Sequence, residues 1–172
     1  MKIKKHILKI VQVFLCLLLV LNLIVLKPIE VNAQLALTQG NDDVEYLRSL
    51  ESLRDLDYET WQVVVYSHGR PEGSTVLRIV GYPGTLRIDH PLSLQVQAGL
   101  KEWKLKDITL ENPKLVNDTR EAAAEFELQP LLMDLNNNRP LRLILPNAFN
   151  EMPIPPYLVK EWRSFLTFEN NQ

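Results

Sequence analysis

The sequence is poor in the residues that thiol, metal and phosphate chemistry need. Its 172 residues include one cysteine, three histidines and six glycines. The cysteine, Cys16, lies in an apolar run near the N-terminus, so the rest of the chain has no thiolate ligand, cysteine nucleophile or internal disulfide. Phosphate cradles need a glycine-rich loop followed by a helix with a lysine, whereas residues 81–84 fit a tight turn.

Histidine is too scarce to build an obvious metal centre. Beyond residue 33 only His68 and His90 remain, and they lie in different predicted loops. A zinc or iron site needs three or four placed donors, so one would form here only if the loops met and Asp89 joined them. We therefore expect no metal site and no bound cofactor.

The N-terminus has the pattern of an export signal. Four lysines fall within the first nine residues, and residues 10–26 are apolar apart from two polar side chains. A Val-Asn-Ala tripeptide that fits a signal peptidase site follows, so residues 1–33 are predicted to be a secretory signal cleaved between Ala33 and Gln34. A retained membrane anchor is the alternative, because the run approaches the roughly 17–20 residues that span a bilayer.

The rest of the chain has the size and charge of one acidic domain. Residues 34–172 hold 14 of the 19 basic residues and 20 of the 21 acidic residues, a net charge of −6. This length is enough to bury a core. Nucleic acid is not an expected partner, because phosphate binding needs a basic surface. Residues 34–41 are predicted to be a flexible arm, and residues 42–172 a single globular domain.

The hydrophobic pattern changes from helical spacing to strand spacing at Trp61. Before it, residues 44–55 are predicted to form a short helix capped by an aspartate. After it, apolar and polar residues alternate, as in strands with one buried face. Strands are predicted over residues 61–66, 75–81, 86–89, 92–97, 103–110, 124–128 and 141–145. The strand over 103–110 is expected to contain a bulge at Asp107.

Helical segments are predicted on both sides of the last strand. Residues 130–138 fit one helical turn, and Pro155-Pro156 suits the first turn of a longer helix. The fold class is therefore mainly β with flanking helices (α+β). We predict a single antiparallel, strongly curved sheet or partial barrel of about seven strands, with a short N-terminal helix and a C-terminal amphipathic helix packed on it. A sandwich is the alternative, but short connections favour pairing of sequential neighbours.

Two motifs contain catalytic residue types. Asp89 and His90 belong to the hydrolase set, but neighbouring strand residues point to opposite faces, and no Gly-x-Ser-x-Gly elbow occurs. Glu125 and Glu127 share a strand face about 7 Å apart, within the range of inverting glycosidases. Solvated charges on a polar strand face are the simpler interpretation of this pair. We therefore expect no enzyme, with a hydrolase that uses His90 and Asp89 as an alternative.

Several aromatic and apolar residues are candidates for partner contact. Aromatic residues dominate binding hot spots, and an extended proline-rich segment such as residues 152–156 can serve as a docking strip. Alternatively, that segment only fixes the start of the C-terminal helix. The three tryptophans, Trp61, Trp103 and Trp162, fall on predicted core stripes. The candidate partner-binding residues are Tyr82, Met152, Ile154 and Tyr157.

Four blocks stand out in the sequence: residues 53–64 (LRDLDYETWQVV), 77–84 (LRIVGYPG), 89–91 (DHP) and 155–163 (PPYLVKEWR). Together they resemble a family of small exported cyanobacterial proteins described only as a domain of unknown function. The resemblance covers most of the chain beyond residue 33. It implies a host with thylakoids, and it implies no catalytic residues, because the family has none assigned.

These observations predict an exported accessory protein. We expect a non-enzymatic protein-binding module of the periplasm or thylakoid lumen, with a membrane or lumenal protein complex as its partner. It would touch the membrane itself only through an uncleaved signal segment. The alternative is a carrier of an apolar ligand, such as a lipid or pigment, inside the curved sheet.

Overall fold

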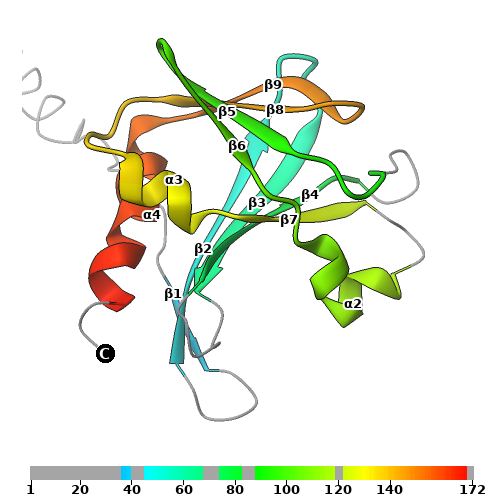
Figure 1. Cartoon of the computed structure of the whole chain (residues 1–172), viewed down its shortest axis with the longest axis horizontal. Helices are drawn as coiled ribbons and strands as arrows, with labels where there is room; N and C mark the ends of the chain where they lie inside the picture. The colour runs from blue at the N-terminus through cyan, green and yellow to red at the C-terminus, as the bar shows by residue number, and fades with distance from the viewer. Residues whose placement is uncertain (1–35, 40–44, 68–73, 83–87, 119–121, 170–172) are drawn as a thin grey trace, which may run out of the picture. The chain divides into compact units, whose positions relative to one another are not determined.

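The described part of the chain forms nine strands and a small number of helical segments (Figure 1). The structure is a computed structural model that describes residues 36–39, 45–67, 74–82, 88–118 and 122–169. All of them belong to a unit that spans Ala33–Gln172. The elements are β1 (Ala36–Gln39), β2 (Glu45–Arg54), β3 (Thr60–Ser67), β4 (Thr75–Val80), β5 (Leu94–Ala98), β6 (Lys101–Leu105), the 3-10 helix η1 (Thr109–Glu111), α2 (Pro113–Val116), β7 (Ala123–Glu127), α3 (Gln129–Asp134), β8 (Leu141–Leu145), β9 (Phe149–Ile154) and α4 (Pro156–Glu169).

The strands form two antiparallel sheets, not the single strongly curved sheet or partial barrel that the sequence predicted. One sheet has the order β1-β2-β3-β4-β7, and the other has the order β6-β5-β8-β9. No strand occurs between Ile88 and Ser93, and Pro91 has no N–H to donate, so β5 does not continue the first sheet and instead begins the second. Pairing of sequential neighbours therefore fails at this connection, and β7 lies beside β4 instead.

A few backbone hydrogen bonds link the two sheets. The Ile108 N–H donates to the Glu125 carbonyl (2.8 Å), and the Glu127 N–H donates to the Lys106 carbonyl (3.0 Å). Elsewhere, the Leu56 N–H donates to the Glu151 carbonyl (3.0 Å), which joins the β2–β3 connection to β9. The two sheets are thus separate ladders, and these backbone hydrogen bonds join them at their margins.

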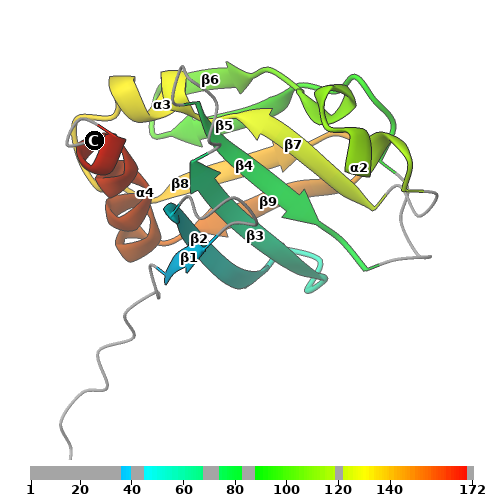
Figure 2. The same ribbon diagram turned by 90° about the horizontal axis from the view of Figure 1, so that it is seen from below.

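The core lies between the inner faces of the sheets and is completed by helices. Alternate residues of β3, β4 and β7 face it, as do alternate residues of β5, β8 and β9. Both views place α3 and α4 together on one side of the sheets and α2 on the opposite side (Figures 1 and 2). The fully buried α4 residues are Leu158, Val159, Trp162 and Phe165. None of the helices in the described ranges is long and apolar enough to cross a membrane.

The predicted N-terminal helix over residues 44–55 is wrong, because β2 occupies residues 45–54. The leucines at 47, 50 and 53 recur every three residues, which favours one face of a helix, but pairing with β3 makes the segment a strand. The register runs without a break from Arg48↔Tyr66 to Arg54↔Thr60. Leu47 is buried, whereas Leu50 lies on the other face of β2 and is exposed. Within the predicted flexible arm, residues 36–39 form β1 and pair with β2.

The clearly alternating segments are confirmed as strands β3, β4, β5, β7 and β8, and the C-terminal helix is confirmed as α4. The strand predicted over 103–110 stops at Leu105, and η1 follows instead. The strand predicted over 86–89 lies partly outside the described residues, and its residues 88 and 89 are in no strand. The proline-rich strip belongs to β9, which the sequence did not predict. The predicted signal segment lies outside the described residues.

Candidate functional site

The β2–β3 connection is a hairpin loop that one buried carboxylate holds in place. The Asp55 Oδ1 accepts from the N–H groups of Asp57 and Glu59 (both 2.9 Å), and its Oδ2 accepts from the Trp61 indole Nε1 (2.8 Å). Asp55 also forms backbone bonds with Tyr58 and Glu59 (3.2 and 3.1 Å). The carboxylate therefore fixes both arms of the turn and ties the turn to the core.

The base of this loop rests on both sheets. The buried Trp61 ring packs edge-on against the Phe149 ring of β9, with centroids 4.9 Å apart. The Leu56 N–H bond to Glu151 adds a backbone contact at the same place. A turn anchored in this way loses little conformational entropy when a partner binds to it.

The tip of the loop displays two large side chains to solvent. Leu56 is 58% exposed and Tyr58 is 79% exposed. Tyr58 has a φ of 65°, in the left-handed region, where glycine or asparagine is favoured and other residues lose about 1–2 kcal/mol. The turn therefore carries an aromatic residue at a position where glycine or asparagine would be more stable.

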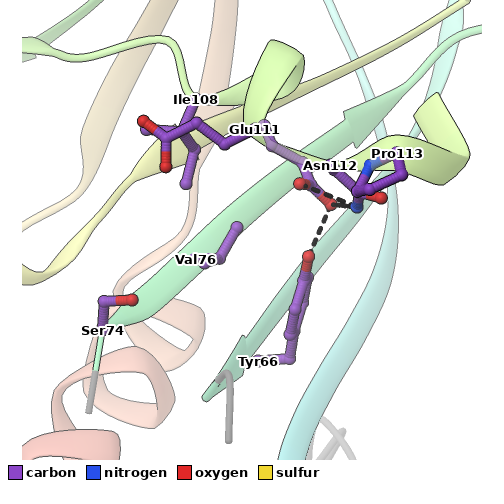
Figure 3. Close-up of a pocket in the computed structure, with 8 residues that line it drawn as sticks. Tyr66, Ser74, Val76, Ile108, Glu111, Asn112 and Pro113 are labelled. Carbon is purple, nitrogen blue, oxygen red and sulfur yellow. Dashed lines mark hydrogen bonds between the residues drawn. The ribbon is translucent and has the colours of Figure 1, made fainter. Parts of the chain in front are cut away.

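A second candidate region lies on the outer face of the first sheet, beneath η1 and α2. Glu125 of β7 is buried there and accepts at Oε1 from the Tyr66 hydroxyl (2.5 Å) and from the Arg78 Nε (2.6 Å). The Asn112 amide donates to both carboxylate oxygens (3.1 Å each) (Figure 3). The Arg78 guanidinium forms an ion pair with Glu125 and lies over the Tyr66 ring.

Thr109 connects this group to a histidine–aspartate pair. The Glu125 N–H donates to the Thr109 hydroxyl (2.8 Å), and that hydroxyl donates to the Asp107 Oδ1 (2.6 Å). The other carboxylate oxygen of Asp107 contacts the His90 Nδ1 (2.7 Å) and accepts from the Leu92 N–H (2.8 Å). One polar network thus runs from the segment before β5 to the outer face of β4.

The network perturbs the titration of its members. Burial raises the pKa of Tyr66 well above its ordinary value, and the contact with Glu125 adds to this. Burial would also raise the pKa of Asp107, but hydrogen bonds from Thr109 and His90 outweigh burial and hold it below the ordinary value. Burial would lower the pKa of Arg78, but Tyr66 and Glu125 raise it. The Asp107 carboxylate and the Arg78 guanidinium are therefore held in their charged forms.

A small pocket of about 90 Å³ opens beside this network (Figure 3). Its lining residues are Tyr66, Ser74, Val76, Ile108, Glu111, Asn112, Pro113 and Glu125. The volume suits one or two water-sized groups, far below the roughly 300–1,000 Å³ of typical ligand sites. Glu125 is compensated by Arg78, and the network joins η1 to β7. The geometry therefore favours a structural role for this region.

The structure gives the candidate catalytic residues partners that differ from those considered from the sequence. His90 pairs with Asp107, not with Asp89, and His68 lies outside the described residues. Glu125 is buried and ion-paired, so the solvated face expected for Glu125 and Glu127 is wrong for the first of them. Within the described ranges, no group of three or more His, Cys, Asp or Glu side chains is placed to hold a metal ion.

The candidate partner-binding residues divide into two groups. Tyr82 and Tyr157 are at the surface, 72% and 38% exposed. Met152 and Ile154 are fully buried, because β9 pairs with β8 and turns both side chains into the core. The docking strip predicted at residues 152–156 is therefore wrong for these two residues. Of the tryptophans, Trp61 and Trp162 are buried and Trp103 is half-buried, while the cleavage residues Ala33 and Gln34 lie outside the described ranges.

The hairpin residues Asp55, Leu56 and Tyr58 were not predicted as site residues from the sequence. A helix was wrongly predicted over residues 44–55, so the turn that begins at Asp55 was not recognised. A signal was nonetheless present, because an aspartate often accepts hydrogen bonds from the backbone two residues further on and so favours turns. The exposure of Leu56 and Tyr58 required the tertiary structure.

No curated protein and no solved structure matches the chain significantly. A family profile described as "Protein of unknown function (DUF3122)" matches residues 33–165. This match covers most of the sequence and nearly all of the described elements, including both the hairpin loop and the buried network. The chain therefore belongs to the DUF3122 family.

Proposed function

We propose that this protein is a non-enzymatic accessory module that binds a partner protein through the β2–β3 loop. The observation that carries the proposal is Tyr58, which is exposed on a rigid turn in a backbone conformation that disfavours tyrosine. Strained residues persist where the surrounding structure holds them, and they occur often at functional sites. Tyrosine is also among the residues that dominate binding hot spots.

The loop has the physical properties of a preformed contact. Leu56 and Tyr58 together offer an aliphatic and an aromatic surface, and Asp55 already fixes the backbone between them. A partner would desolvate both side chains without having to order the turn. Tyr82 and Tyr157 are further exposed aromatic residues that such a partner would contact if its surface extended beyond the loop.

We also propose that the protein is exported in a cyanobacterial host, to the periplasm or thylakoid lumen. The basic end and apolar run within residues 1–33 support export. The DUF3122 match begins at residue 33, where the predicted signal ends. The partner would accordingly be a membrane or lumenal protein complex.

The test is affinity capture from solubilised membranes with a pair of substitutions at the loop tip. Leu56→Ser removes the aliphatic contact, and Tyr58→Asn removes the aromatic ring while suiting the left-handed backbone. Leu110→Ser, at an exposed leucine of η1, is the matched control. We expect the control to retain every protein that the parent chain captures, and the double variant to lose the specific partner.

The proposal fails if the double variant captures the same proteins as the control, or if the parent chain captures none. A binding role is favoured over an apolar-ligand carrier because the inner positions of both sheets are taken by buried side chains. It is favoured over a hydrolase because His90 pairs with Asp107, which Thr109 and Leu92 already bind.

A further inference from the structure

The contact between β2 and α4 contains buried polar atoms that lack hydrogen bonds. They are the Ser49 hydroxyl on β2 and the Glu161 Oε1 on α4, and the indole Nε1 of the next α4 residue, Trp162, is also buried without a hydrogen bond. Glu161 is only 7% exposed, and the other two residues are more deeply buried. Buried polar groups are nearly always hydrogen-bonded, and a buried carboxylate without a partner is particularly unfavourable. Glu161 therefore requires a physical explanation.

The described residues around Glu161 add negative charge, and no cation among them forms an ion pair with it. Glu51 of β2 lies nearby, and its negative charge disfavours ionisation of Glu161. Burial and the charges of both acids raise the pKa of Tyr157 on α4. On α4, Lys160 is exposed and the Arg163 guanidinium donates to the Asn138 side chain (2.6 Å). Adjacent strand residues face opposite ways, so Arg48 points away from the Ser49 side. On α3, the acidic Asp134 is engaged by Trp103 and Lys101.

We propose that the β2–α4 contact is a proton-sensitive joint, packed tightly when Glu161 is a neutral acid and loosened when Glu161 is a carboxylate. In the acid form the side chain carries no net charge into the core. In the carboxylate form an uncompensated charge faces Glu51 in a poorly hydrated contact. This inference concerns α4 alone and does not depend on the proposed role of the β2–β3 loop.

The direction of the Glu161 pKa shift agrees with this geometry. Burial raises the pKa of Glu161, the interaction of its carboxyl with the Ser49 hydroxyl offsets part of the rise, and the Glu51 charge raises the pKa further. Because the pKa of Glu161 is higher in the folded state than in the unfolded state, its contribution to the stability of this contact is complete below the ordinary pKa of 4.5. That contribution is lost as the pH rises through the folded-state pKa. Acid therefore tightens this joint.

Loosening of this contact would also affect the other core contacts of the helix, because α4 supplies several fully buried side chains to the core. Trp162 follows Glu161 directly, and Leu158 lies one helical turn before it. Both would move if the helix shifted away from β2. Hydrogen-exchange protection of the α4 amides should therefore follow the protonation state of Glu161.

The experiment combines a direct titration with exchange measurements on matched variants. Carbon-13 NMR of the parent protein gives the midpoint of the Glu161 carboxyl, assigned by its loss in Glu161→Gln. Hydrogen exchange, corrected for the intrinsic pH dependence, gives the protection of α4 in the parent, in Glu161→Gln and in Glu102→Gln, at an exposed glutamate of β6.

We expect Glu161 to titrate above the ordinary glutamate value. In the parent and in Glu102→Gln, the hydrogen-exchange protection of α4 should fall by up to about tenfold for each pH unit between the ordinary glutamate pKa and the folded-state pKa of Glu161. It should not change with pH in Glu161→Gln. A Glu161 midpoint at or below the ordinary value would overturn the proposal even if the variant failed to fold. The same pH dependence in all three proteins would also overturn it.

Discussion

Replacing Asp55 by alanine tests whether one carboxylate holds the β2–β3 loop. The substitution removes the acceptor of three hydrogen bonds, from the Asp57 and Glu59 amides and from the Trp61 indole. Water can solvate the two loop amides, but the indole N–H is buried and would stay unpaired, at about 1–3 kcal/mol. Adding about 1 kcal/mol for the weakened turn, we expect the free energy of unfolding to fall by about 3 kcal/mol.

Urea unfolding measures this change directly. For a slope of about 2 kcal/mol per M, the midpoint should move down by roughly 1.5 M. Asp57→Ala is the matched control, because its exposed side chain receives none of these bonds and its backbone N–H is retained. That variant should stay within about 0.5 kcal/mol of the parent.

A second measurement separates loop order from global stability. In Asp55→Ala the amides of Asp57 and Glu59 should exchange faster than in the parent, after correction for the change in global stability. The reasoning would be refuted if Asp55→Ala lowered the free energy of unfolding by less than 0.5 kcal/mol, roughly the scale of a neutral surface change. It would also be refuted if the exchange of the two amides were unchanged.

Three further predictions concern the network and the core. Arg78→Met should lower the free energy of unfolding by about 3 kcal/mol in thermal or urea unfolding, because it leaves the buried Glu125 without its ion-pair partner; an effect within 0.5 kcal/mol would contradict this. Asp107 has a lowered pKa, so its contribution is present above the ordinary value of 3.8 and is lost as the pH falls through the folded value; acid titration of stability should be shallower in Asp107→Asn, and an identical slope would argue against the assignment. Met152→Ala should lower the free energy of unfolding by about 2–5 kcal/mol as a core residue, whereas exposed Met133→Ala should be nearly neutral; equal effects would mean that β9 is not packed as described.

Sequence patterns predicted the strands whose burial is strictly one-sided. Leu94 and Val96 of β5 alternate with glutamines, and Leu141, Leu143 and Leu145 of β8 alternate with Arg142 and Ile144. In each case the leucine or valine set is fully buried. One face of each strand meets the core, so local pattern and tertiary packing require the same conformation.

The same patterns failed where tertiary pairing overrides the local spacing. Leu47, Leu50 and Leu53 have helical spacing, yet pairing with β3 makes the segment a strand that places Leu50 on the face opposite Leu47. The division into two sheets also depends on non-local pairing, since β4 bonds to β7 and not to the nearer β5. Local propensity contains no information about such a choice.

The polar network was beyond sequence reasoning for the same reason. His90 and Asp107 are 17 residues apart, and Tyr66 and Glu125 are 59 residues apart. Glu125 occupies a position that alternation assigns to solvent, and it is buried because η1 and α2 cover that part of the sheet. Residue types identified candidates such as His90, but their partners are set by the topology.

The hydrogen bonds between the margins of the two sheets also bear on self-association. Free strand edges attract other chains, but the outer edge of β7 is already bonded to Lys106 and Ile108. On the second sheet, β9 includes Pro153 and β6 exposes Lys101 and Lys104, which are features that oppose strand addition. Among the edges whose side chains are described, backbone recruitment of a neighbouring chain is therefore disfavoured. Exposed side chains such as Leu56 and Tyr58 on the β2–β3 loop are therefore more available for association than these strand edges.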